Sequence, residues 1–245
     1  MEYPVSQARL KYDLAKWFDQ GWNVFKAHIW QFVLLILIMV IPGIIVGGIS
    51  GVASYLEASR NPNPAAFPLI PTAAKVGIAV VSALLGAAVS TPLIVGMAAV
   101  SLGAVRTGVF DWDRIWTGFR KWPAAFVIGL ISGVLTLIPM LFPLLWIIFP
   151  IWLAVGLWDM FAAYTLSETG TDLGTAVNRG IELIKGNFWW AVLFTLVSGL
   201  IAVIGVIACC VGLFFTAAFY QALLAVAYND LSSQLGAAGS EVQAQ

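Results

Sequence analysis

Four long stretches without a charged residue constrain this chain more than any other feature. They cover residues 27–56, 76–105, 122–158 and 186–229, and contain 30, 30, 37 and 44 residues. One helical crossing of a bilayer needs about 20 apolar residues, so each of the first two stretches has room for one crossing. The fourth holds two, folded back around Cys209–Gly212. The third is interrupted only by Asp159, continues to Ser167, and also holds two around a proline-rich break at 139–143.

Composition agrees with this reading. Hydrophobic residues make up 61% of the chain and charged residues 10%, against about 45–50% and 25% in soluble domains. A soluble core cannot absorb this excess, so lipid must solvate much of the chain. The 12 basic and 12 acidic residues give zero net charge, and we expect no nucleic-acid partner.

We therefore predict an all-α fold, a polytopic integral membrane bundle of six transmembrane helices arranged as three hairpins. A single membrane domain is expected at residues 1–230, followed by a flexible cytoplasmic tail at 231–245. The six helices are expected at residues 29–52, 76–100, 123–140, 144–166, 188–208 and 212–229.

The distribution of Lys and Arg predicts the orientation. With six crossings, the side that carries both termini holds ten basic residues, and the other side holds only Arg60 and Lys75. Under the positive-inside rule, the richer side faces the cytoplasm. We expect a multi-pass protein of a bacterial inner membrane with both termini in the cytoplasm.

Each hairpin is preceded by a segment with an apolar stripe at helical spacing. These segments cover residues 10–27, 110–121 and 171–186. In the last, Leu173, Val177, Ile181 and Ile184 form the stripe, and Thr171 or Asp172 is the predicted N-cap. Such helices lie in the headgroup plane of a membrane, or they simply cover one end of the bundle.

The segments also recur as a repeat. The stretch Gly21–Trp30 aligns with Gly180–Trp189, with Gly, Lys and Trp in matching places, and Trp116–Trp122 aligns more loosely. The chain is therefore interpreted as three units, each an amphipathic helix followed by a transmembrane hairpin.

Several short stretches carry a resemblance to a known family, namely Thr91–Gly96 with Arg106, Asp111–Phe119, Ala176–Asn187, Cys210–Gly212 and Ala227–Asp230. They resemble a superfamily of bacterial six-helix membrane proteins. It includes the YciC-like proteins and the membrane domain attached to some glycerophosphodiester phosphodiesterases. The resemblance implies the same membrane fold, but no soluble phosphodiesterase domain is present, so that activity is not implied.

Asp159 is the most informative single residue, since a carboxylate costs roughly 2.5–3.5 kcal/mol at the centre of a membrane helix and less near its ends. One interpretation is an ion pair or hydrogen bond with Arg106, Arg179 or Lys185 that holds the helices in register. The other is a proton or cation site, or a contact to substrate.

Other polar and small residues in the predicted helices give weaker signals. A polar cavity would be lined by Ser90, Thr91, Tyr164, Tyr220 and Gln221. Small residues spaced by four let helices approach closely, at Gly43, Gly47 and Gly51, at Gly129 and Gly133, and at Gly86 and Ser90.

The sequence contains no catalytic motif, and we expect no catalytic residues, no metal ligands and no cofactor. The leading hypothesis is a non-enzymatic scaffold, assembly factor or accessory subunit of a membrane complex. Its partners would be the lipid bilayer and another membrane protein or a second copy of the chain. A transporter or channel subunit for a small solute or ion is the first alternative, and a lipid-handling or membrane-shaping protein is the second.

Overall fold

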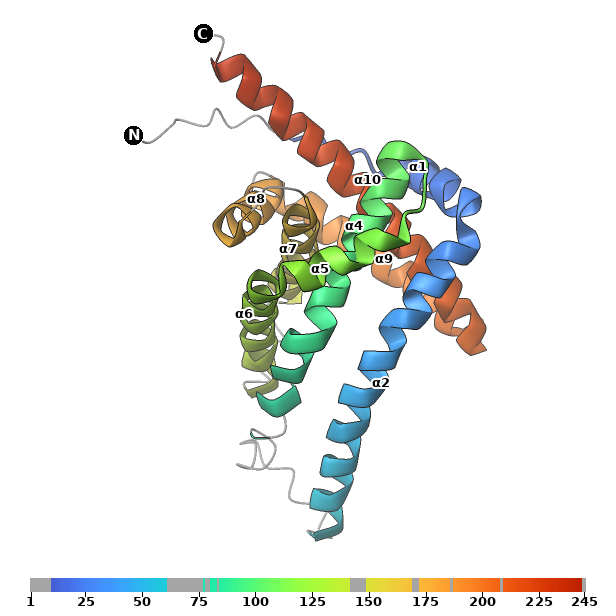
Figure 1. Ribbon diagram of the computed structural model, residues 1–245, viewed down its shortest axis with the longest axis vertical. Coiled ribbons are helices and arrows are strands. Elements are labelled where there is room, and N and C mark those ends of the chain that lie inside the picture. The colour runs from blue at the N-terminus through green and yellow to red at the C-terminus, as the bar shows by residue number, and fades with distance from the viewer. Residues whose placement is uncertain are drawn as a thin grey trace.

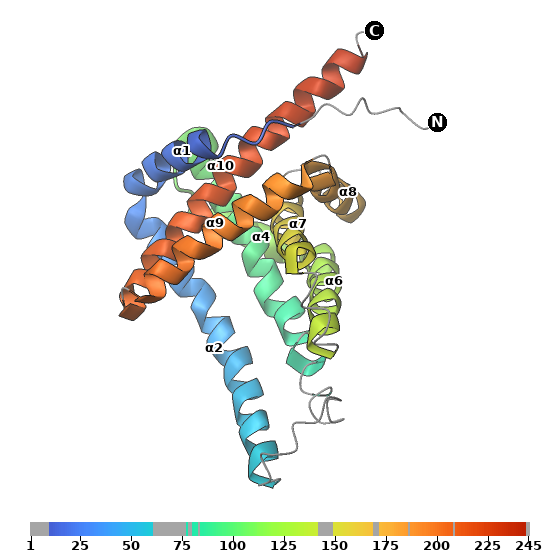
Figure 2. The ribbon, with the colours of Figure 1, turned by 180° about the vertical axis from the view of Figure 1, so that it is seen from behind.

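The computed structural model describes residues 10–60, 77, 80–82, 84–141, 149–168, 172–185, 187–207 and 209–243. Every regular element in these residues is a helix, which confirms the predicted all-α class. Figure 1 and Figure 2 show the bundle from two opposite sides. Thr171 and the end of the proline-rich break, residues 142–143, lie outside the described residues.

The long helices follow the six predicted ranges closely. Within the second range, a π-helical turn, η1, directly precedes α4, which carries Pro92 in its first turn. The long elements are α2 (Ile29–Arg60), η1 (Gly86–Ser90) with α4 (Thr91–Thr107), α6 (Trp122–Leu141), α7 (Phe149–Ser167), α9 (Phe188–Ile207) and α10 (Cys209–Gln243).

Three of these helices run past their predicted ends, to Arg60 in α2, Thr107 in α4 and Gln243 in α10. The tail expected at 231–245 is therefore helical up to Gln243. The reason is packing, because Leu231 is fully buried and the Gln234 side chain bonds the backbone of the N-terminal segment. An apolar-run criterion cannot detect a helix that continues through polar residues.

The three predicted amphipathic segments are α1 (Leu14–Ala27), η2 with α5 (Trp112–Trp116 and Thr117–Arg120) and α8 (Leu173–Lys185). We call them the short segments. Each begins at an aspartate whose side chain accepts a backbone N–H of the first turn, namely Asp13, Asp111 and Asp172. The N-cap predicted at Asp172 is confirmed, and these hydrogen bonds hold the pKa of its carboxyl below the usual range.

Two of the short segments turn sharply into the long helix that follows. The angle between α1 and α2 is 90°, and the angle between α8 and α9 is 94°. Both turns lie within the aligned stretches Gly21–Trp30 and Gly180–Trp189, so the predicted sequence repeat has a structural counterpart.

Contacts between the units are cyclic. The short segment of each unit packs on the last helix of the preceding unit: α1 on α10, η2 and α5 on α4, and α8 on α7. A glycine lies at each contact, where there is little room for a side chain. A Cβ added at Gly21 would be 3.3 Å from Leu223, one at Gly118 would be 1.7 Å from Pro92, and one at Gly180 would be 3.1 Å from Trp158.

The core lies where α4, α7 and α10 contact one another. The outer helices fill the spaces between them: α2 against α10 and α4, α6 against α4 and α7, and α9 against α7 and α10. Large aromatic side chains fill this core and are almost fully buried, among them Trp17, Phe161, Tyr164, Phe194 and Tyr228.

Two helices in the described part of the chain are long and apolar enough to cross a membrane, Val80–Thr107 and Gly212–Ala237. Counting each bent pair, α1 with α2 and α8 with α9, as one span raises the number to four. A third apolar helix, the Trp122–Leu135 part of α6, is shorter than a full span.

Candidate functional site

One carboxylate, Glu168, directly follows α7 and links several helices. It lies at the end of the bundle that contains Arg106 and Arg179, which we call the polar end. Its two oxygens lie 2.6 Å from Arg106 of α4 and 3.5 Å from Arg179 of α8. Arg106 also donates from Nε to Oδ1 of Asn229 on α10, at 2.8 Å. We call these four residues, together with Lys121, the Glu168 cluster.

Lys121 lies between α5 and α6 and brings the second unit into the cluster. Its amine donates to the carbonyl oxygen of Leu166 at 2.7 Å and to that of Glu168. These carbonyls are at the C-terminal end of α7, where the helix dipole favours a cation. Burial lowers the pKa of the Lys121 amine, and the Glu168 carboxylate opposes this shift. The cluster thus connects α4, α6, α7, α8 and α10.

A second carboxylate, Asp230, fastens the N-terminal segment to α10. It accepts from the Lys16 amine at 2.5 Å, from the indole N–H of Trp17 at 2.9 Å and from the Gln234 amide at 3.1 Å. Gln234 also accepts from the backbone N–H of Lys11 at 2.8 Å and donates to its carbonyl at 3.1 Å. Both backbone groups of Lys11 are therefore satisfied by one side chain.

The same N-terminal segment is also tied to the third unit. The Tyr12 hydroxyl donates to the Leu183 carbonyl of α8 at 2.7 Å, and the Asn187 amide donates to the Leu10 carbonyl at 2.6 Å. Burial raises the pKa of the Tyr12 phenol well above its usual value. All three units are thus joined at the polar end of the bundle by charged or hydrogen-bonded contacts.

The structure does not give Asp159 the partner that the sequence predicts. Its carboxylate accepts from the Ser132 hydroxyl of α6 at 2.5 Å, while Arg106 and Arg179 bind Glu168 instead. The reason is distance along α7: Asp159 lies nine residues before Glu168, about 13 Å at the rise of an α-helix. The third predicted partner, Lys185, lies on the edge of a groove between α7 and α8.

The residues of the predicted polar cavity fall in two places. Tyr164 and Gln221 bond each other, since the Gln221 amide donates to the Tyr164 oxygen at 3.1 Å and the Tyr164 hydroxyl donates to the Gln221 carbonyl at 3.2 Å. Both are buried, and Tyr220 beside them is half-buried. Thr91 is buried at the far end of α4, where its hydroxyl lies over Gly129, and Ser90 precedes it. The residues predicted to line one polar cavity therefore belong to two separate contacts.

Glu168 and Asn229 were missed as site residues by sequence reasoning. A usable signal was present, because Glu168 follows the third apolar stretch at the end predicted to carry ten basic residues. An acidic residue in that place is more readily ion-paired than one inside the helix, since its partners reach it from helix ends.

Among the described residues, no three His, Cys, Asp or Glu side chains group closely enough to hold a metal ion. His28 occupies the turn between α1 and α2, with its ring 5.8 Å from that of Phe110. The chemistry of the polar end is thus that of ion pairing and backbone capping between elements.

Comparisons of this chain with known protein families, with curated proteins and with solved structures find no match. The resemblance to the YciC-like superfamily therefore stays a prediction.

Proposed function

We propose that the chain is an integral membrane protein with six spans that serves as a non-enzymatic scaffold or accessory subunit, and that α2 is its docking helix. The observation that carries this proposal is the glycine-lined, exposed face of α2. In this proposal both termini lie in the cytoplasm of a bacterium, and the partner is a membrane protein or a second copy of the chain.

The polar contacts support the proposed topology. In the six-span arrangement, Arg106, Lys121, Arg179 and the two chain ends all lie on one side of the membrane. The Glu168 cluster brings the first three together, and Asp230 joins the N-terminal segment to α10. Residues separated by a bilayer could not form these contacts, because its hydrocarbon core is about 30 Å thick.

The exposed face of α2 supports the docking role. At Gly43, Gly47 and Gly51 an added Cβ would meet no atom of the described residues within 4 Å. Large apolar side chains flank them, including Ile44, which is 66% exposed. In both views α2 diverges from the other helices toward its C-terminal end (Figure 1, Figure 2). Small residues spaced by four are the usual contact surface between membrane helices.

Purification of the full chain in mild detergent, with identification of bound proteins, tests the proposal. Gly47→Leu should leave the chain folded, because the position is open, but should release the bound partner or second copy. Gly199→Leu is the matched control, since Gly199 on α9 is equally open but has no glycine four residues away. A chain that runs as the same lone monomer with and without Gly47→Leu would overturn the docking role.

A transporter or channel remains the alternative, but the polar contacts favour it less. Its predicted cavity residues occupy two separate contacts, and Tyr164 and Gln221 use their polar groups on each other. Solute flux through liposomes that contain the purified chain would favour this alternative over the scaffold.

A further inference from the structure

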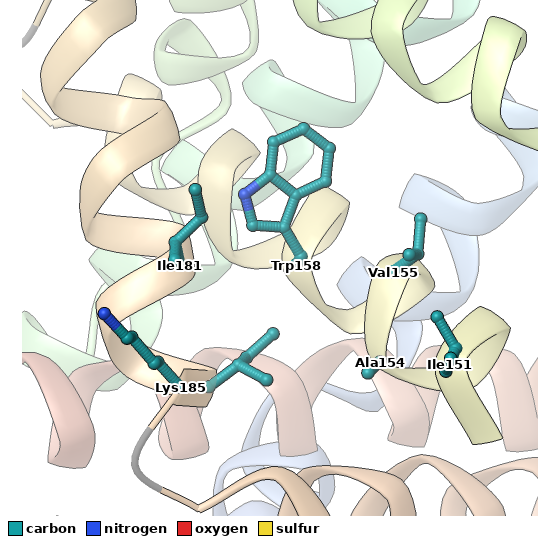
Figure 3. Close-up of a pocket in the computed structure, with 7 residues that line it drawn as sticks. Ile151, Ala154, Val155, Trp158, Ile181 and Lys185 are labelled. Atoms are coloured by element: carbon teal, nitrogen blue, oxygen red, sulfur yellow. The ribbon is translucent and has the colours of Figure 1, made fainter.

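A groove between α7 and α8 combines an apolar wall with one cationic edge. Its volume is about 280 Å³, and it is shallow and open to the surroundings. Figure 3 shows α7 side chains on one side and α8 side chains on the other, with Lys185 at the α8 edge. The groove is lined by Ile151, Ala154, Val155, Trp158, Ile181, Ile184 and Lys185.

The α7 wall runs along the helix axis. Ile151, Ala154, Val155 and Trp158 recur at intervals of three and four residues, so they share one face of α7. From Trp158 to Ile151 the wall extends about 10 Å along α7. An extended hydrocarbon chain fits the shape and chemistry of such a wall.

Trp158 holds α8 against α7 at one end of the groove. Its indole N–H donates to the Val177 carbonyl of α8 at 3.3 Å. Gly180 lets α8 lie directly on this ring, because an added Cβ would be only 3.1 Å from it. The groove is thus a built feature of the packing between α7 and α8.

Lys185 supplies the charge at the edge. Its side chain is exposed and forms no hydrogen bond or ion pair with the described part of the chain. The other charged residue in this turn of α8 is Glu182, which is also exposed and forms no recorded ion pair with it. The amine is therefore available to a ligand.

The depth of Lys185 matches the lipid headgroups in the proposed topology. Trp189 and Trp190, which follow Lys185 in the first turn of α9, are 72% and 48% exposed. Exposed tryptophans at the end of a membrane helix mark the interface between headgroups and hydrocarbon. A lysine at this level attracts anionic lipids.

We propose that the α7–α8 groove binds one anionic phospholipid of the cytoplasmic leaflet, with its phosphate on the Lys185 amine and an acyl chain along Ile151, Val155 and Trp158. This inference rests on the membrane placement proposed above, but not on the docking role of α2.

The repeat provides an internal control. Lys26 occupies the position in the first unit that aligns with Lys185, and Trp30 aligns with Trp189 and is equally exposed at 72%. The Lys26 amine, however, lies over the Trp22 ring, 5.7 Å from its centroid. Charge and depth are thus matched, whereas the groove and an amine without a ring contact distinguish Lys185 from Lys26.

The test is native mass spectrometry of the purified full chain with phosphatidylglycerol or phosphatidylcholine of the same acyl chains. The wild type should retain phosphatidylglycerol in preference to phosphatidylcholine. Lys185→Gln should reduce the retention of phosphatidylglycerol about fivefold and leave phosphatidylcholine unchanged. Lys26→Gln should behave as the wild type.

A second variant tests the groove apart from the charge. Val155→Trp should fill the wall and reduce the retention of both lipids, while the elution volume and melting temperature confirm a folded chain. If Val155→Trp is misfolded, phosphatidylglycerol with a photoreactive acyl chain should still label residues 151–158 of the wild type.

Equal losses in Lys185→Gln and Lys26→Gln would overturn the proposal, since they would indicate general attraction to charge. Retention of phosphatidylglycerol by Lys185→Gln at the wild-type level would also overturn it. So would labelling of the wild type by the photoreactive lipid only outside residues 151–158 and 181–185. Release of a partner by Gly47→Leu, by contrast, reports on the docking role alone, so failure of either proposal leaves the other testable.

Discussion

The contacts made by the short segments and the outer face of α2 use glycine in opposite ways. At Gly118 and Gly96 an added Cβ would lie 1.7 Å and 2.1 Å from a backbone oxygen of the neighbouring element. At Gly43, Gly47 and Gly51 it would meet nothing within 4 Å among the described residues. The first group is required by contacts within the chain, whereas the second leaves a smooth helix face available to another helix.

The two regions also differ in how their polar groups are treated. Near the polar end, Glu168 and Asp230 each bind several partners from different units. Between Leu34 and Ile44, α2 carries no charged side chain, and its exposed residues there are apolar or glycine. One region therefore holds the chain together, whereas the other carries the surface that we propose for a partner.

The largest expected effect is at the tight glycine contact. Gly118→Leu should destabilise the chain by about 3 kcal/mol or more, because the backbone of α4 cannot move away from a new side chain without disturbing the core. The melting temperature in detergent measures this loss. Gly47→Leu is the comparison, and an equal loss there would remove the distinction between the two glycine groups.

A smaller loss is expected at the Glu168 cluster. Glu168→Gln should cost about 1–3 kcal/mol, since two arginines lose a partly buried carboxylate. The control is Asp111→Asn, which breaks a 3.3 Å pair with Arg114 whose two side chains are each 45% exposed, and should change stability by less than about 0.5 kcal/mol. Similar losses in the two variants would mean that the cluster does not hold the units together.

Asp159→Asn should change stability by about 1 kcal/mol or less, because an asparagine oxygen can still accept from the Ser132 hydroxyl. It should also leave partner binding unchanged in the detergent purification. A variant that remains assembled but loses solute flux in liposomes would instead favour the transporter alternative.

A loss of similar size, which depends on pH, is expected in the N-terminal segment. Tyr12→Phe should cost about 1 kcal/mol at neutral pH through loss of the hydrogen bond to Leu183. Burial raises the pKa of the Tyr12 phenol, so this residue stabilises the fold below about pH 10 and loses that contribution as the unfolded chain ionises at higher pH. Melting curves should therefore show the difference between the two proteins narrowing above pH 10, and a constant difference would contradict this assignment.

Apolar spacing and caps predicted much of the fold, since both depend on nearby residues. The starts of α2 at Ile29 and of α6 at Trp122, and the cap at Asp172, follow from such local patterns. The fold-back predicted around Cys209–Gly212 is misplaced, because these residues already belong to α10. The helical course of residues 231–243 could not be predicted in this way, because it depends on Gln234 binding Lys11 more than 200 residues away. The partners of Arg106 and Arg179 were missed for the same reason: the distance between helix ends is set by the fold.

Crosslinking from α2 in native membranes tests the central claim most directly. A photoreactive amino acid would replace Ile44 on the glycine face of α2 or, as a control, Leu200 on α9, which are 66% and 56% exposed. We predict that the probe at position 44 crosslinks to one defined protein, either a partner or a second copy, and that the probe at position 200 labels lipid alone. Labelling of lipid alone from both positions would contradict the assignment of α2 as the docking helix.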